Sequence, residues 1–216
     1  MKVIPTIFAR NTKEFDLKFD ILRKISRELQ IDFMDGKFVE AKSVLLKDLP
    51  SFKGKGRFEA HLMVNNPESY IDELNKKGFF KILFHCESFR DLDQLNRMVF
   101  LIRSKNMQAW IVFNPKTDFN RIFDVLEKIH SGLSGIMLMG HTPGFEGKPL
   151  DTNVVRRVIN LKRMYNKVKI QIDGGVNDKN IEALKNAGVD IVNVGSFVSK
   201  SRNPKNALSL LKKSVN

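Results

Sequence analysis

Eight short apolar segments recur along the chain, and stretches with helical periodicity separate most of them. The segments are rich in the β-branched and aromatic residues that favour strands. They comprise residues 2–8, 29–34, 58–64, 81–87, 109–115, 135–141, 168–174 and 191–197. Strands that alternate with helices are typical of parallel pairing through βαβ crossovers. This pattern predicts an α/β protein.

Capping signals mark several of the intervening helices. Asn11 and Glu14 resemble a capping box before the first helix, and Asn66 with Pro67 resembles a helix start after the third strand. After the seventh strand, Asn177 can cap a helix that ends near residue 188. The alternation therefore continues along the whole chain.

Eight such units fit either a closed (β/α)₈ barrel or an open, doubly wound sheet. A chain of 216 residues lies at the compact end of the barrel size range. The first strand is not followed by the G-x-G-x-x-G turn of a dinucleotide-binding sheet. We therefore predict a single-domain (β/α)₈ TIM barrel over residues 1–216.

A barrel of this kind gathers its chemistry at the carboxyl ends of the strands. Polar side chains lie at or near those ends in six of the eight segments, and a Gly-Ser pair ends the last. The residues are Asp32, His61, His85, Asn114, His141, Asp173, Gly195 and Ser196. Core polar residues without a common role would not favour one end of each strand, so the sequence predicts a functional site there.

Three of these side chains form a chemically coherent set. Asp32, His61 and Asp173 come from the second, third and seventh strands and would point into the barrel mouth. Two carboxylates and an imidazole can bind a divalent metal. Two carboxylates that face a substrate from opposite sides can also act as base and acid. The competing interpretation is three unrelated buried groups, each satisfied by backbone.

Glycine-rich segments follow the sixth, seventh and eighth strands. Residues 173–175 (DGG) and 195–196 (GS) can present backbone N–H groups to a phosphate, although glycine also simply ends strands. Residues 142–149 (TPGFEGKP) suit a lid over a ligand or an ordinary surface loop. By spacing alone, Met34, Met63 and Met139 are interpreted as core residues. His85 could support a neighbouring site residue or be a satisfied core histidine, and the spacing favours the core interpretation.

Composition limits the cellular setting and the partners. No apolar run reaches the roughly 18 residues of a membrane span, so we expect no membrane partner. Cys86 is the only cysteine, which favours a reducing cytoplasm. The net charge of +13 could attract a phosphorylated small molecule or nucleic acid. The basic residues are scattered, which favours a solvated surface over a nucleic-acid interface.

Eight short strings carry a resemblance to a known family. They are PTI (5–7), D-x-M-D-G-x-F-V (32–39), HLMVNNPE (61–68), FHCE (84–87), FNPKT (113–117), PGFEG (143–147), IDGGV (172–176) and VGS (194–196). Their order and spacing resemble ribulose-phosphate 3-epimerases from about Ile4 to the last helix. That family consists of (β/α)₈ barrels, isomerases that interconvert D-ribulose 5-phosphate and D-xylulose 5-phosphate, usually with zinc or ferrous iron.

The resemblance implies roles for matching positions. Asp32 and Asp173 would be the acid/base pair and metal ligands, and His61 a further ligand that also borders the substrate. Thr6 stands where the family usually has a serine that contacts substrate, and three methionines would line the reacting carbons. The phosphate would be held by Gly144, Phe145, Glu146, Gly147, Gly174, Gly175, Val176, Gly195 and Ser196, and the methionines are Met34, Met63 and Met139.

The chain departs from the family pattern at three places. Gln30 stands where the family has its first metal-ligating histidine. An amide oxygen is a neutral, harder ligand, so we expect Gln30 to shift preference from Zn²⁺ or Fe²⁺ toward Mn²⁺ or Mg²⁺. Glu40-Ala41 replaces a Pro-Asn pair, and Glu146 replaces a glycine of the lid, which adds negative charge near the expected phosphate.

These residues favour a cytoplasmic ribulose-phosphate 3-epimerase that uses two aspartates and a divalent metal to move the C3 proton. One alternative is an epimerase for another ketose phosphate, such as allulose 6-phosphate. Another is a non-catalytic descendant that binds a phosphorylated ligand, which Gln30 would favour. Association into a homo-oligomer is implied by the resemblance only.

Overall fold

Eight parallel strands close into one barrel in the computed structural model of the chain, which describes residues 1–129 and 132–215. The strands pair in sequence order, and β8 pairs with β1 to close the ring. They are β1 (Lys2–Ile7), β2 (Glu28–Met34), β3 (Arg57–Met63), β4 (Lys81–His85), β5 (Gln108–Phe113), β6 (Gly135–Met139), β7 (Ile170–Asp173) and β8 (Ile191–Val194). The predicted (β/α)₈ barrel is confirmed.

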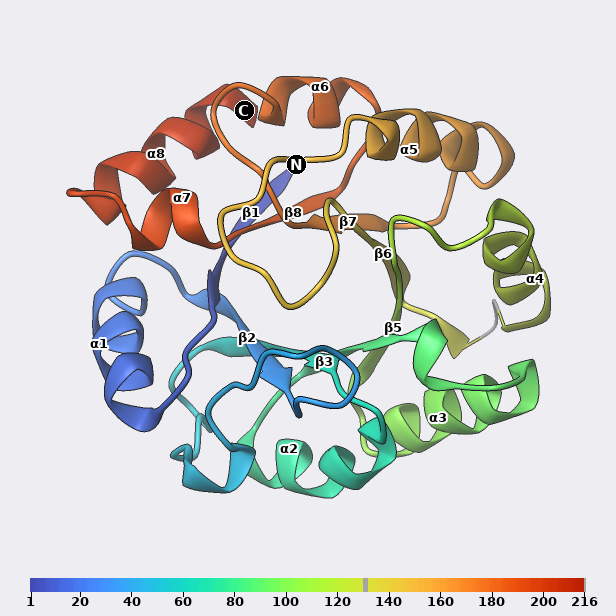
Figure 1. Cartoon of the computed structure of the whole chain (residues 1–216), viewed down its shortest axis with the longest axis horizontal. Helices are drawn as coiled ribbons and strands as arrows, with labels where there is room; N and C mark the ends of the chain where they lie inside the picture. Colours follow the sequence, from blue (N-terminus) through green and yellow to red (C-terminus); the bar gives the residue numbers. More distant parts are fainter. Residues whose placement is uncertain (130–131, 216) are drawn as a thin grey trace.

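Helices surround the barrel on its outside (Figure 1). They are α1 (Thr12–Leu22), α2 (Ile71–Lys77), α3 (Leu92–Ser104), α4 (Phe119–Ile129), α5 (Asn153–Met164), α6 (Ile181–Asn186), α7 (Ser196–Ser199) and α8 (Pro204–Val215). The connection after β2 carries only the short 3₁₀ helix Leu46–Asp48. Within the described residues, no helix is both long and apolar enough to cross a bilayer.

The capping signals are partly confirmed. Asn11 Oδ1 accepts a hydrogen bond from the Glu14 amide at 2.9 Å, as expected for the start of α1. Asn66 is the N-cap residue and Pro67 lies in the first turn, as predicted, although the helix there begins as the 3₁₀ segment Pro67–Tyr70 and the Asn66 side chain forms no cap bond within the described chain. The prediction for Asn177 is wrong. Asn177 belongs to the preceding turn, because its Oδ1 accepts from the Lys179 amide and α6 begins only at Ile181.

Alternation along the strands separates core from site. Ile31 and Phe33 of β2 face the helices and belong to the main hydrophobic core between barrel and helices. Gln30, Asp32 and Met34 alternate with them and so face the barrel interior. The register places Asp32 beside His61 of β3. One pleat therefore brings the polar side chains of neighbouring strands together inside the barrel.

A buried polar layer fills the barrel beneath those side chains. Lys81 Nζ lies 2.8 Å from Glu59 Oε2, and Glu59 Oε1 accepts hydrogen bonds at 2.9 Å from both Gln171 and Asn193. The Lys81 ammonium also lies 3.7 Å from the centre of the Trp110 ring. Four of these side chains are charged or amide groups, and each is at most 2% exposed. They form a floor layer of Glu59, Lys81, Gln171 and Asn193.

Candidate active site

A small cavity opens at the carboxyl end of the barrel, and the gold loop after β6 crosses this end in Figure 1. The volume of this cavity is about 60 Å³. The lining residues come mainly from β1, β2, β3, β6, β7 and the loops after β6, β7 and β8. They are Thr6, Phe8, Asp32, Met34, His61, Met63, Met139, His141, Asp173, Val176, Ser196, segment 143–147 and the glycines Gly174, Gly175 and Gly195.

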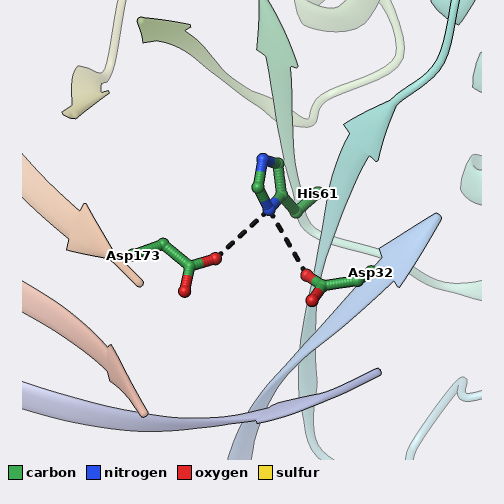
Figure 2. A group of neighbouring side chains, drawn as sticks. All are labelled: Asp32, His61 and Asp173. Carbon is green, nitrogen blue, oxygen red and sulfur yellow. Dashed lines mark ion pairs between the residues drawn. The ribbon is translucent and has the colours of Figure 1, made fainter. Parts of the chain in front are cut away.

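Asp32 and Asp173 approach His61 from opposite sides at the base of this cavity (Figure 2). The Nδ1 atom of His61 lies 3.3 Å from Asp32 Oδ1 and 3.2 Å from Asp173 Oδ2. Both aspartates are 8% exposed and His61 is fully buried. His61 Nδ1 forms no aligned hydrogen bond with any group in the described chain. The ring nitrogen therefore points between the carboxylates rather than at either one.

The pKa of each of these three groups depends on the charges of the other two. Burial raises the pKa of Asp32 to about 6, and repulsion by Asp173 adds to this rise. Burial would also raise the pKa of Asp173, but contact with His61 holds it below its ordinary value. Burial alone would lower the pKa of His61, yet the two carboxylates raise it to about 9. Without a bound cation, His61 is thus protonated at neutral pH.

Gln30 contacts the same two carboxylate oxygens from below. Its Nε2 donates to Asp32 Oδ1 at 2.9 Å and to Asp173 Oδ2 at 2.6 Å. Its Oε1 is buried and has no hydrogen-bond partner among residues 1–129 and 132–215. Gln30 is fully buried, and it supports the carboxylates without lining the cavity.

The residues fit a divalent cation. Asp32, His61 and Asp173 each offer a donor atom, and these atoms lie within 4.8 Å of one another. Donors that share one ion at about 2.1 Å lie roughly 3.0–3.4 Å apart in octahedral or tetrahedral geometry. The 3.2 and 3.3 Å separations match this, and His61 Nδ1 is aimed at the space between the oxygens. Two carboxylates and one imidazole suit several divalent ions.

His85 supports His61 from behind. The two Nε2 atoms lie 3.0 Å apart, and the rings stack with centroids 5.2 Å apart. On its other side, His85 Nδ1 lies 3.3 Å from Glu87 Oε2. Glu87 in turn accepts hydrogen bonds from the Asn114 amide and the Thr117 hydroxyl. The interpretation of His85 as a core histidine is thus incomplete, because it joins His61 to the loop after β5.

Glycine backbone forms the opposite end of the cavity. Gly174 and Gly175 have φ values of 109° and 73°, a region that side chains disfavour. A Cβ atom on Gly175 would collide with the backbone of Pro149 and Leu150, so only glycine lets the end of the loop after β6 approach here. Gly195 and Ser196 come directly after β8 and not within it, so the prediction that they end a strand is corrected by two residues. His141 likewise lies two residues beyond β6.

The loop 142–149, which we call the lid, is attached to α7. Glu146 Oε2 lies 3.0 Å from Lys200 Nζ, and its Oε1 lies 3.5 Å from Ser199 Oγ. The negative charge expected beside the phosphate end is therefore paired. At the lid tip, Phe145 is 51% exposed and Lys148 lies 3.5 Å from the centre of its ring. Sequence inspection gave no indication of Lys200, because one lysine among many carries no pattern.

The residues to which the resemblance assigns roles all line the cavity except Gln30. His85 and Asn114, which the strand-end pattern also included, lie outside the lining. Thr6 is buried on β1, and its hydroxyl has no hydrogen-bond partner in the described part of the chain. Met34 and Met63 form a small apolar cluster with Phe8, which sequence inspection missed. The string FHCE could have indicated Glu87, since a carboxylate two residues after a histidine can orient it.

One known protein family matches nearly the whole chain. The family described as the ribulose-phosphate 3 epimerase family matches residues 2–199. The cytoplasmic isoform of ribulose-phosphate 3-epimerase from Oryza sativa is 27% identical, over 99% of this chain and 94% of the rice protein. The Aquifex aeolicus ribulose-phosphate 3-epimerase is 31% identical, over 79% of this chain and 76% of its own.

Solved structures share the fold at lower identity. KGPDC from Streptococcus mutans, in complex with D-R5P, superposes with a TM-score of 0.76 at 12% identity. The alignment covers 99% of this chain and 96% of that one. Together with the family match along nearly the whole sequence, the barrel and its paired aspartates lead to one conclusion. The chain belongs to the ribulose-phosphate 3-epimerase family.

Proposed function

We propose that this protein is a cation-assisted isomerase that interconverts D-ribulose 5-phosphate and D-xylulose 5-phosphate by moving the proton at C3. The observation that carries the proposal is the pair Asp32 and Asp173, which flank His61 from opposite sides in one buried cavity. Inversion at a carbon needs proton removal on one face and delivery on the other, and this pair offers both.

The two aspartates are prepared for different proton states. Asp173 has a lowered pKa and stays ionised, so it can accept the C3 proton. Asp32, with a pKa raised to about 6, can carry a proton at neutral pH at modest cost. In the reverse direction the roles exchange. Met34, Met63 and Met139 border this position and exclude water from the reacting carbon.

The glycine end binds the remote phosphate in this proposal. Backbone N–H groups of Gly147, Gly175, Gly195 and Ser196 can surround an anion, and the lid closes over it. Binding energy from this end holds the sugar so that C3 stays between the aspartates. The D-R5P bound to the Streptococcus mutans neighbour supports a phosphosugar ligand for this barrel shape.

Asp32, His61, Asp173 and Gln30 are the residues that would hold the cation. When bound, a divalent cation supplies positive charge that stabilises the negative charge formed on the C2 oxygen of the sugar. The buried Nδ1 of His61 and its 3.2–3.3 Å spacing from the carboxylates support this assignment. The name of the rice relative, a cytoplasmic isoform, supports a cytoplasmic location for the activity.

The decisive experiment follows the C3 proton in D₂O. The protein is incubated with D-ribulose 5-phosphate and Mn²⁺, Mg²⁺, Fe²⁺ or Zn²⁺ in turn, and deuterium at C3 and xylulose 5-phosphate are measured. We expect both to appear together with at least one cation. If neither appears with any cation, and a panel of ketose phosphates including allulose 6-phosphate is also inert, the proposal is wrong.

A further inference from the structure

Four donor atoms form a closed ring at the base of the cavity. Asp32 Oδ1 and Asp173 Oδ2 each lie between His61 Nδ1 and Gln30 Nε2. Around the ring the separations are 3.3, 3.2, 2.6 and 2.9 Å. All four residues would hold the cation in the proposed function, and at three corners the atom observed in the ring can act as a ligand. The fourth corner is the amide nitrogen of Gln30, which can donate hydrogen bonds but cannot bind a cation.

The orientation of the Gln30 amide follows from charge. Two carboxylate oxygens within hydrogen-bond distance attract an N–H₂ group and would repel a carbonyl oxygen. The amide therefore directs Nε2 at the carboxylates and leaves Oε1 buried, without a partner in the described residues. An unpartnered buried carbonyl is unfavourable, and this orientation accepts that cost in exchange for two charge-assisted hydrogen bonds.

A cation between the carboxylates reverses this preference. Positive charge at the centre of the ring would repel the N–H₂ group and attract the carbonyl oxygen. A half-turn of the amide exchanges Nε2 and Oε1 while the rest of the side chain stays in place, since the two atoms have nearly the same position by symmetry. The same turn would complete a set of three oxygens and one nitrogen around the ion.

We propose that the Gln30 amide is a reversible switch, whose N–H₂ group substitutes for the cation in the empty site and whose carbonyl oxygen ligates the cation in the loaded site. This inference rests on the proposed function only for the position of the cation. Its consequence is weak, exchangeable binding, because loading breaks the two hydrogen bonds. We expect the loss to weaken cation affinity about 100-fold relative to a histidine at this position.

The side-chain amide can be observed directly by NMR on the natural protein labelled with ¹⁵N-glutamine. The chain has four glutamines, and the Gln30 signals are those absent from the spectrum of Gln30→His. Without cation, both Gln30 N–H protons should resonate downfield, as expected for donors to carboxylates. On titration with diamagnetic Mg²⁺ or Zn²⁺, they should move upfield. Calorimetry on the same samples gives the affinity.

Gln171 is the internal control, because it is a fully buried glutamine of the floor layer that donates to Glu59 and Asn193. Its signals should not move. Gln30→His should bind Zn²⁺ about 100-fold more tightly than the natural protein.

Three results would overturn the switch: cation binding with unmoved Gln30 signals, no cation binding at all, or equal Zn²⁺ affinity in the variant. The first and third leave the epimerase proposal intact, because activity in D₂O is measured separately. Loss of that activity with every cation would instead reject the epimerase and not the switch.

Discussion

Asp32 and Asp173 have the same side chain and the same 8% exposure, yet their pKa values move in opposite directions. The difference arises from how desolvation, mutual repulsion and contact with His61 balance at each carboxylate. Such a divided pair is what proton transfer in both directions needs, because one member must begin ionised and the other protonated. The residue type alone, as read from a sequence, gives no such asymmetry.

The aspartate pair gives a prediction that separates the two proton transfers. Asp32→Asn and Asp173→Asn should each lower epimerisation by about 10²–10⁴-fold. Each variant keeps one base, so in D₂O each should exchange the C3 proton of only one of the two epimers. NMR of the recovered substrate measures this. Asp178→Asn, at an exposed loop position, should behave as the natural protein. Exchange of both epimers by either site variant would contradict the assignment.

The pKa of His61 predicts a proton count for cation binding. Without cation, its raised pKa of about 9 keeps Nδ1 protonated at pH 7.5, while Asp32, with a pKa of about 6, is mostly ionised. A cation must displace that Nδ1 proton. We expect release of about one proton at pH 7.5, and affinity that rises roughly tenfold per pH unit up to about pH 9. Calorimetry in buffers of different ionisation enthalpy tests this, and pH-independent affinity would contradict it.

At the scale of elements, the sequence predicted all eight strands, and their observed ends differ by a few residues. The apolar runs continue past β6, β7 and β8 because glycine and histidine follow without a sharp break in hydrophobicity. Asn66 stands at the predicted helix start but forms no side-chain cap bond within the described chain, whereas the Asn177 side chain belongs to the turn before α6. Periodicity thus located the elements, whereas the lid attachment depends on contact between segments 53 residues apart.

The lid attachment gives a prediction at this scale. Lys200→Met should leave Glu146 unpaired beside the phosphate end, and the resulting repulsion should raise KM about 3- to 5-fold with kcat unchanged. A second change, Glu146→Gln, removes the negative charge and should restore KM. Steady-state kinetics of the single and double variants measure both effects. A double variant with KM as high as that of Lys200→Met would show that charge is not the cause.

Across the whole molecule, the barrel interior is built in layers. The floor layer joins β3, β4, β7 and β8 through Glu59, Lys81, Gln171 and Asn193, directly below the side chains of the site. This layer could not be predicted from the sequence, because its members lie up to 134 residues apart and none belongs to a motif. Site residues could be predicted because strand ends converge in any such barrel, whereas interior partners depend on the register of every strand.

Breaking the floor layer should destabilise the whole fold. Lys81→Met leaves the Glu59 carboxylate buried without the lysine ammonium that pairs with it. This loss should lower the free energy of unfolding by about 3–5 kcal/mol. Urea unfolding followed by circular dichroism measures the change. The exposed Lys169→Met is the matched control and should change stability by less than about 0.5 kcal/mol. Equal stability of the two variants would mean that the ion pair between Lys81 and Glu59 does not stabilise the fold.

The contacts that connect His61, His85 and Glu87 also determine which ring nitrogen of each histidine carries a hydrogen. The ionised Glu87 can only accept, so His85 carries its hydrogen on Nδ1 and presents a lone pair at Nε2. His61 must then keep its own hydrogen on Nε2, which leaves Nδ1 as the atom that would exchange a proton for a cation in the proposed function. The tautomer at the centre of the barrel is therefore set from its periphery, where Thr117 and the Asn114 amide hold Glu87. Redesign of the outer loop after β5 is therefore expected to change which nitrogen of a histidine two strands away carries the hydrogen.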